Sequence, residues 1–535
     1  MNEAVDVLVI GAGAAGAAAT WRLARAGIRV LCLEQGDWVK PESLRSADPA
    51  WERHRLQDWN PNPNIRRLPA DYPIDDRHSP LRPLLFNGVG GSTVMWSGFN
   101  PRFRPGDFRV RRCDGVADDW PLTYPELAPY YDLADAIQGV SGVAGDPAYP
   151  PRQVAPLPPL PMSPSGLRLI DAFEALGWHW WVADRASRSQ PDGDLAACNG
   201  CGVCEMACPR RAKGSTDVTL WPAALAAGAR LETGARVREI TVAADGRATG
   251  ALYIDRTGAE HQARAAAVIV AANGIGTPRL LLASRSNRFP DGLANSSGLV
   301  GRNLMFHPIA YVSGVFADLL HGHLGPSPSV VYSHQFYASD PSRGFVRGYM
   351  LSGLRGHGPL TMALGAWAEV APWGRDHHRR FARVLGRTGS IAILGEDLPD
   401  QRNRVTLSPT LTDSDGIPAP ELHYSVDDNS RRLLDHGIAQ ASQALMAAGA
   451  RETVVMPLLR DAGFHLMGTA RMGNDPRHSV VDRWGRSHDV PNLFLCDGSV
   501  FVTSAAVNPT PTILALALRT ADHIIATKGA ARGSA

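Results

Sequence analysis

One segment near the N-terminus limits the fold of this chain more than any other. Residues 7–10 are four consecutive apolar residues, and the glycine turn Gly11-Ala12-Gly13-Ala14-Ala15-Gly16 follows them directly. Residues 17–26 then have helical composition, and residues 29–33 form a second apolar run that ends at Glu34. This order of strand, glycine turn, helix and strand predicts a βαβ unit of a parallel sheet.

The glycines of this turn suit a dinucleotide. Gly11 permits a tight turn, Gly13 lets the backbone approach a pyrophosphate, and Gly16 lets the helix pack closely on the strand. The phosphates would lie at the helix N-terminus, where free N–H groups and the helix dipole favour anions. Glu34 lies where a carboxylate accepts a hydrogen bond from a ribose hydroxyl. The turn alone fits FAD and NAD equally.

Composition excludes several classes of protein. The formal net charge of +2 over 535 residues argues against a nucleic-acid partner. No segment approaches the roughly 18–20 apolar residues of a membrane-spanning helix. The N-terminus lacks the charged and apolar regions of a secretory signal. We therefore expect a cytoplasmic protein without a membrane span, with export in complex with a signal-bearing partner as the alternative.

Local patterns predict further elements. Residues 235–242, 249–255 and 267–271 are β segments, separated by the hairpin signals Asp245-Gly246 and Thr257-Gly258. Residues 509–525 have helical composition after a proline start. Residues 40–85 are polar and marked by prolines, which favours a long surface loop.

Five blocks, taken together, resemble the glucose–methanol–choline (GMC) oxidoreductase family. They appear in family order along nearly the whole chain, and the similarity is to the pyranose-oxidase-like and bacterial FAD-dependent sugar dehydrogenase branch. Residues 105–195 and 310–400 match no family motif. The blocks are residues 11–34, 88–103, 268–281, 298–303 and 465–510.

The resemblance implies an α/β fold, α+β overall. It consists of a Rossmann-like FAD-binding domain interleaved with a substrate domain built on an antiparallel sheet. We expect the FAD-binding domain in three parts, residues 1–105, 213–310 and 461–535. Residues 106–212 would be an insertion with a Cys-rich loop, and residues 311–460 the substrate-binding domain.

The resemblance also implies FAD contacts beyond the turn and Glu34. Met95 stands where pyranose-oxidase-like members carry a histidine that attaches the flavin covalently, so we expect non-covalent FAD. Val237 falls where the family uses a backbone contact to adenine, and Asp497-Gly498 resembles a second contact on the flavin side. The expected cofactor-binding residues are Gly11, Gly13, Gly16, Glu34, Gly90, Gly91, Ser92, Met95, Trp96, Val237, Asp497 and Gly498.

Two residues of the last block match the family's catalytic pair. His465 opens His-Leu-Met-Gly-Thr, and a histidine suits proton abstraction because its pKa lies near working pH. Asn508 matches the Asn of the His/Asn dyad of pyranose-oxidase-like members, where choline-like members have a second histidine. We expect His465 to be the general base and Asn508 to orient the substrate oxygen.

A cysteine cluster has metal-ligand spacing. Cys198-x2-Cys201-x2-Cys204-x3-Cys208-Pro209 follows the pattern of bacterial ferredoxins. It also resembles the cluster region of bacterial FAD-dependent glucose and sorbitol dehydrogenases. We treat Cys198, Cys201, Cys204 and Cys208 as candidate iron–sulfur ligands. A tetrahedral zinc site and metal-free thiols are the alternatives.

The resemblance implies oxidation of an alcohol group (CH–OH to carbonyl) by hydride transfer to flavin N5. The expected substrate is a sugar, glycoside, aminoglycoside or polyol. Residues 307–378 hold seven of the 17 histidines, which would suit a wall for a polyhydroxyl compound. The alternatives are an oxidase or dehydrogenase of an apolar (sterol or long-chain) alcohol and a non-catalytic flavin or electron-transfer subunit. A cluster would imply an electron-acceptor subunit or cytochrome as partner.

Overall fold

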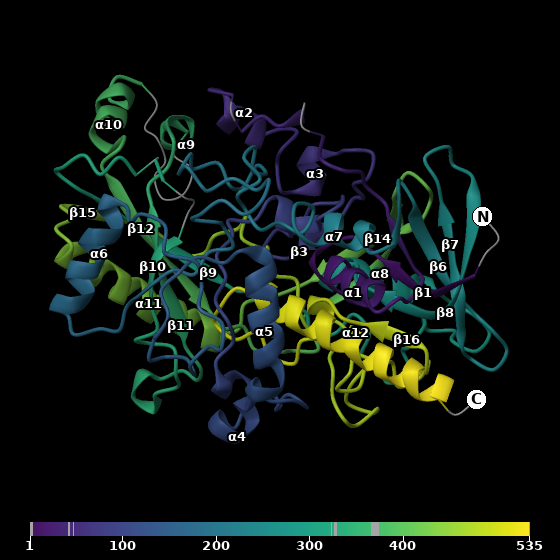
Figure 1. Cartoon of the computed structure of the whole chain (residues 1–535). Helices are drawn as coiled ribbons and strands as arrows, with labels where there is room; N and C mark the ends of the chain where they lie inside the picture. Colours follow the sequence, from purple (N-terminus) through teal and green to yellow (C-terminus); the bar gives the residue numbers. More distant parts are fainter. Residues whose placement is uncertain are drawn as a thin grey trace.

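The computed structural model describes residues 4–40, 43–46, 48–322, 324–325, 329–364 and 374–533. Two large sheets lie side by side in Figure 1, the seven-stranded sheet at the right and the six-stranded sheet at the left. The long C-terminal helix α12 (Thr510–Gly533) runs below the first sheet. No helix in these described ranges is long and apolar enough to cross a membrane.

The predicted βαβ unit forms the centre of the seven-stranded sheet. Strand β1 (Val5–Ile10) pairs in parallel with β2 (Val30–Glu34) and with the C-terminal half of β8 (Glu260–Val270). Parallel strands β5 (Arg230–Thr233) and β16 (Leu493–Leu495) extend it. The three predicted β segments are present, and β6 (Arg236–Val242), β7 (Ala248–Ile254) and the N-terminal half of β8 pair antiparallel. Strand β8 begins seven residues before the predicted third segment, so the predicted residues 267–270 lie in the half that pairs with β1.

Alternation along β1 determines what covers each face of this sheet. Successive side chains of a strand point to opposite faces. Val7 and Val9 pack with the alanine-rich helix α1 (Ala14–Arg25) and with α12, whereas Leu8 and Ile10 face the core on the other side. Both faces are therefore buried, which explains the continuous apolar run in the sequence.

The second sheet is antiparallel, and helices cover one of its faces. Ala310, Val312 and Ile391 pack with α6 (Pro164–Ala175) and α11 (Asp428–Ala447). The strand order is β15 (Glu452–Met456), β9 (Ile309–Val315), β12 (Thr388–Gly395), β11 (Tyr349–Arg355), β10 (Ser329–Ser333) and β4 (Trp181–Val182).

Shorter elements connect and flank the two sheets. A three-stranded sheet has the order β13 (Arg404–Thr412), β14 (Pro418–His423) and β3 (Asp75–His78). The remaining helices are α2 (Trp51–Arg55), α3 (Pro63–Arg66), α4 (Val110–Asp114), α5 (Tyr124–Gln138), α7 (Leu220–Ala226), α8 (Asn273–Ala283), α9 (Pro359–Ala363) and α10 (His377–Val384). The short 3-10 turns are η2 (Gly91–Val94), η3 (Pro105–Phe108), η4 (Pro341–Arg343) and η5 (Gly498–Val500).

The prediction of a surface loop over residues 40–85 was wrong. This segment contains α2, α3 and β3, and Leu81, Leu84 and Leu85 are buried. Tyr72, Ile74, Leu81 and Leu85 belong to a core cluster that also contains Leu304 and Phe306 from the segment before β9. The polar composition of the segment therefore concealed a part that packs in the core.

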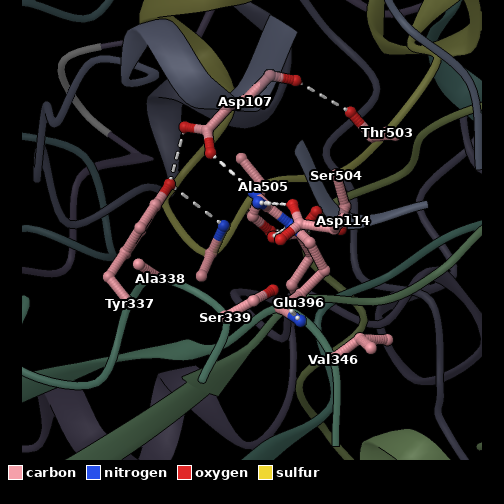
Figure 2. A network of polar contacts seen from close by, with 12 residues as sticks. Asp107, Asp114, Tyr337, Ala338, Ser339, Val346, Glu396, Thr503, Ser504 and Ala505 are labelled. Atoms are coloured by element: carbon pink, nitrogen blue, oxygen red, sulfur yellow. Dashed lines mark hydrogen bonds and ion pairs between the residues drawn. The ribbon is translucent and has the colours of Figure 1, made fainter. Parts of the chain in front are cut away.

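A buried cation joins the segment after Arg104 to the six-stranded sheet (Figure 2). Arg347 donates to Asp107 at 2.8 Å, to Asp114 at 2.7 Å and to Glu396 at 2.8 Å. Its side chain is only 6% exposed. Burial raises the pKa of Glu396 to about 7, and the nearby guanidinium opposes that rise.

We predict that Arg347→Met strongly destabilises the protein. The variant leaves three buried carboxyl groups without their cation, which costs about 3–5 kcal/mol in the free energy of unfolding. Arg402→Met is the matched control, because Arg402 forms an exposed pair with Asp400 that is worth at most about 1 kcal/mol. Urea unfolding of both variants measures the difference, and equal midpoints would contradict the role given to Arg347.

Candidate active site

A cavity of about 370 Å³ extends from the glycine turn of β1 to His465 and Asn508. The seven-stranded sheet supplies one end, residues 84–87 a side, and the six-stranded sheet the far wall. The cavity therefore brings together residues from four of the five sequence blocks. The predicted residues that line it are Gly11, Gly13, Glu34, Gly91, Ser92, Met95, Trp96, Val237, Asp497, Gly498, His465 and Asn508.

Glycine backbones form the end of this cavity. Gly91 has φ of 52°, and a Cβ atom placed on it would come 2.7 Å from the Cα of Gly13. A Cβ atom on Gly16 would come 1.8 Å from the carbonyl oxygen of Gly11. Gly16 and Gly90 are absent from the cavity lining and lie behind it, where they allow this close packing. The result is a cradle of bare backbone.

Two buried carboxylates brace the cradle. Glu34 accepts hydrogen bonds from the backbone N–H of Ala12 at 2.8 Å and of Gly36 at 2.9 Å. Asp497 accepts from the N–H of Asn273 at 2.9 Å and from the hydroxyl of Thr277 at 2.6 Å. Burial raises the pKa of both carboxyl groups, and these hydrogen bonds oppose the rise.

The cavity wall at residues 95–96 offers a bound group one thioether and one free donor. The Met95 sulfur lies 3.9 Å from an Arg66 guanidinium nitrogen. The indole N–H of Trp96 is buried and has no hydrogen-bond partner among the described residues. A buried donor without an acceptor carries a cost that a bound polar ligand would remove.

These observations fit FAD. The backbone cradle at the N-terminus of α1 suits a pyrophosphate, and Glu34 beside it suits a ribose. Val237 lines the same cavity at the start of β6, and so does Trp96 with its unpartnered buried donor. The residues that would hold the cofactor therefore share one continuous space.

The two predicted catalytic side chains contact each other. The Asn508 side-chain nitrogen lies 3.1 Å from His465 Nε2. His465 Nδ1 lies 2.7 Å from Nδ1 of His307, and Nε2 of His307 lies 2.8 Å from the carbonyl oxygen of Ala505. The four groups form one chain of hydrogen bonds at the end of the cavity.

Burial keeps both histidines neutral. It lowers the pKa of His465 well below its ordinary value, with His307 contributing further, and it lowers the pKa of His307 to about 4. A neutral imidazole at His465 is the form that can accept a proton.

Sequence reasoning missed His307. His307 lies four residues after the fourth block and two residues before β9. This position next to a block is the one feature of the local sequence that could have drawn attention to it. Its contact with His465 spans 158 residues of chain, so no local pattern reveals it.

The far wall of the cavity is mostly apolar. Every second residue of three strands faces it, and the pairing register sets them in rows: Ile309, Leu394 and Met350 in one, Tyr311, Ala392 and Ser352 in the next. The expected wall of histidines is not there. None of the described histidines among residues 307–378 lines the cavity, and His323 lies outside the described residues.

The cysteine loop does not assemble a metal site. No three of Cys198, Cys201, Cys204 and Cys208 come close enough to hold a metal ion, and all four lie within the described residues. Burial raises the pKa of the Cys198 and Cys201 thiols, which opposes the thiolate form that a metal needs. The predicted cluster therefore does not fit this arrangement.

A buried lysine ties the cysteine loop to the cavity wall. Lys213 donates to the carbonyl oxygens of Val94 at 2.7 Å, Trp96 at 3.1 Å and Cys204 at 2.5 Å. The only loop residue that lines the cavity is Glu205, which pairs with Arg55 there. The loop thus shapes the cavity through its backbone and one carboxylate.

Comparison with known proteins agrees with this geometry. Residues 158–309 and 399–517 match GMC oxidoreductase, and residues 6–59 match FAD dependent oxidoreductase. The chain is 44% identical to 2-methyl-1,2-propanediol dehydrogenase of Mycolicibacterium austroafricanum, over 98% of this chain and 95% of that one. It is 32% identical to 6'''-hydroxyparomomycin C oxidase of Streptomyces lividus, over 98% and 93%.

A solved structure supports the fold. Formate oxidase superposes with a TM-score of 0.69 at 16% identity, over 98% of both chains. Matching sequence families, relatives along nearly the full length and a shared fold confirm the resemblance inferred from the five blocks. The chain belongs to the GMC oxidoreductase family of FAD-dependent enzymes.

Proposed function

We propose that this chain oxidises the CH–OH group of a compact polyol to a carbonyl, with FAD held non-covalently. The observation that carries the proposal is the position of His465 and Asn508. The two side chains contact each other and line the same cavity as the glycine cradle. A base beside a cofactor cavity is the arrangement that oxidation of an alcohol requires.

The chain's own residues have separate tasks in this reaction. Neutral His465 accepts the hydroxyl proton at Nε2. The Asn508 amide, which occupies that lone pair in the free enzyme, donates to the substrate oxygen and stabilises developing negative charge there. Bound FAD would supply the acceptor for the hydride of the carbinol carbon. The apolar sheet wall excludes water from the reacting atoms.

The cavity wall supports a small substrate with an apolar side. The expected substrates are sugars, glycosides, aminoglycosides and polyols, and the relatives named above act on a diol and on an aminoglycoside. The row Ile309, Leu394 and Met350 offers no polar group and suits a branched aliphatic diol. The apolar wall also favours the second candidate, an apolar alcohol such as a sterol or long-chain alcohol.

A substrate panel tests the proposal. We expect 2-methyl-1,2-propanediol to bleach the flavin absorbance of the anaerobic holoenzyme faster than fructose, paromamine or a long-chain primary alcohol. The apolar row should discriminate against fully hydroxylated faces, because polar groups without partners are costly to bury. Bleaching by the long-chain alcohol alone would favour the second candidate. No bleaching by any alcohol would point to a non-catalytic flavin subunit.

We predict that His465→Ala slows flavin reduction by about 100-fold or more, the usual loss for a missing general base. Asn508→Ala should slow it less and weaken substrate binding, because the amide holds the substrate oxygen. Stopped-flow reduction over a range of substrate concentrations separates the two effects. His261→Ala is the control, since His261 lies on the exposed hairpin and pairs with Asp255. A near-normal rate for His465→Ala would remove it from the base role.

We predict that acid precipitation releases the flavin. A thioether at Met95 cannot form the bond that a histidine forms at this position, and its sulfur already contacts Arg66. Absorbance of the supernatant after precipitation measures the free cofactor. Flavin that stays with the pellet would overturn the non-covalent assignment.

The four cysteines give no support to a route for electrons away from FAD. A relay to an acceptor subunit or cytochrome stays a prediction, and the arrangement of the four thiols does not support a cluster for it. Oxidation of the alcohol by His465 and Asn508 does not depend on such a relay.

A further inference from the structure

The hydrogen-bond chain behind His465 has a direction, and one atom sets it. The carbonyl oxygen of Ala505 can only accept a hydrogen bond. His307 Nε2, 2.8 Å away, therefore carries a proton. Because burial keeps His307 neutral at physiological pH, its other nitrogen, Nδ1, bears a lone pair.

The direction passes to His465 without ambiguity. His307 Nδ1 can only accept, and it lies 2.7 Å from His465 Nδ1, so His465 Nδ1 carries the proton. His465 is then left with a lone pair on Nε2. The Asn508 amide donates to this atom at 3.1 Å, which agrees with the same direction. The opposite tautomer would place two lone pairs face to face.

We propose that His307 is a positioning residue that holds His465 in the tautomer whose lone pair lies at Nε2. The inference rests on the proposed function, in which that lone pair receives the substrate proton. The ring planes of the two histidines lie at 85° to each other, so His307 directs an in-plane lone pair without stacking on His465. His307 is fully buried and makes both of its hydrogen bonds within the protein.

The loop that carries Asn508 also contains the carbonyl group at which the series of hydrogen bonds begins. Ala505 has φ of 55°, the left-handed region that non-glycine residues rarely adopt, and its carbonyl accepts from His307. Tyr337 accepts a hydrogen bond from the N–H of Ala506. Its hydroxyl donates to Asp107, and Figure 2 shows this second contact. The carbonyl that orients His307 is therefore itself fixed by the buried Arg347 network.

Two substitutions separate the orienting role from a packing role. In His307→Asn, the amide oxygen replaces Nδ1 and still accepts from His465, but the link to Ala505 is lost. In His307→Gln, the longer side chain replaces Nε2 and still donates to Ala505, but nothing accepts from His465. Each variant keeps one of the two hydrogen bonds, and both remove the imidazole.

We expect His307→Asn to reduce flavin within about threefold of the natural rate and His307→Gln to slow it by about tenfold or more, the value of one buried hydrogen bond. The substrate concentration for half-maximal reduction should stay unchanged in both, because neither touches the substrate. The reverse order of rates would show that His307 only anchors the loop, and unchanged rates in both would overturn the proposal.

A measurement on the unaltered protein keeps the inference testable if the variants lose flavin or fold poorly. In holoenzyme labelled with ¹⁵N-histidine, the His465 signal is assigned by its loss in His465→Asn. We expect a protonated Nδ1 and an unprotonated Nε2 at pH 7. A protonated Nε2 would overturn the inference whatever the activity. Absence of alcohol oxidation with the expected tautomer would instead count against the proposed function alone.

Discussion

The contact between two glycine backbones, at Gly13 and Gly91, is the constraint on which the site depends. A single methyl group on Gly91 would come 2.7 Å from the Cα of Gly13. The contact fixes the first βα turn against a segment almost eighty residues later. Ser92, Thr93, Met95 and Trp96 of that segment line the cavity. Because backbone meets backbone, no side chain can relax to absorb an error. The cofactor cradle is therefore fixed by sterics before any ligand binds.

The six-stranded sheet gives the cavity its mostly apolar far wall. Its residues alternate between a face packed on α6 and α11 and a face open to the cavity. Successive residues of a strand point to opposite faces. A substitution at Met350 therefore alters the cavity, whereas a substitution at Leu351 alters the core and the stability of the fold. None of the five blocks of resemblance contributes a residue to this cavity face.

Local signals made much of the molecule predictable, and distant pairings made the rest unpredictable. The βαβ unit, the meander from β6 to β8 and the last helix carry their own turn and periodicity signals. His465 and Asn508 were found because they lie in short motifs, although their roles remain proposals. His307 could not be found, since its meaning depends on a partner 158 residues away. The cysteine spacing left iron–sulfur, zinc and metal-free thiols open, because spacing alone does not bring three ligands close enough to hold a metal ion.

The strained loop before Asn508 depends on contacts with distant segments of the chain. A left-handed alanine costs about 1–3 kcal/mol and persists only when its surroundings hold it. Bonds from distant segments do so: Thr503 donates to the Asp107 carbonyl at 3.3 Å and Ser504 to the Asp397 carbonyl at 2.8 Å. The segment after Arg104 and the residues that follow β12 thus hold the loop before Asn508. The six-stranded sheet therefore has two separate tasks: one face lines the cavity, and the residues after β12 hold this loop.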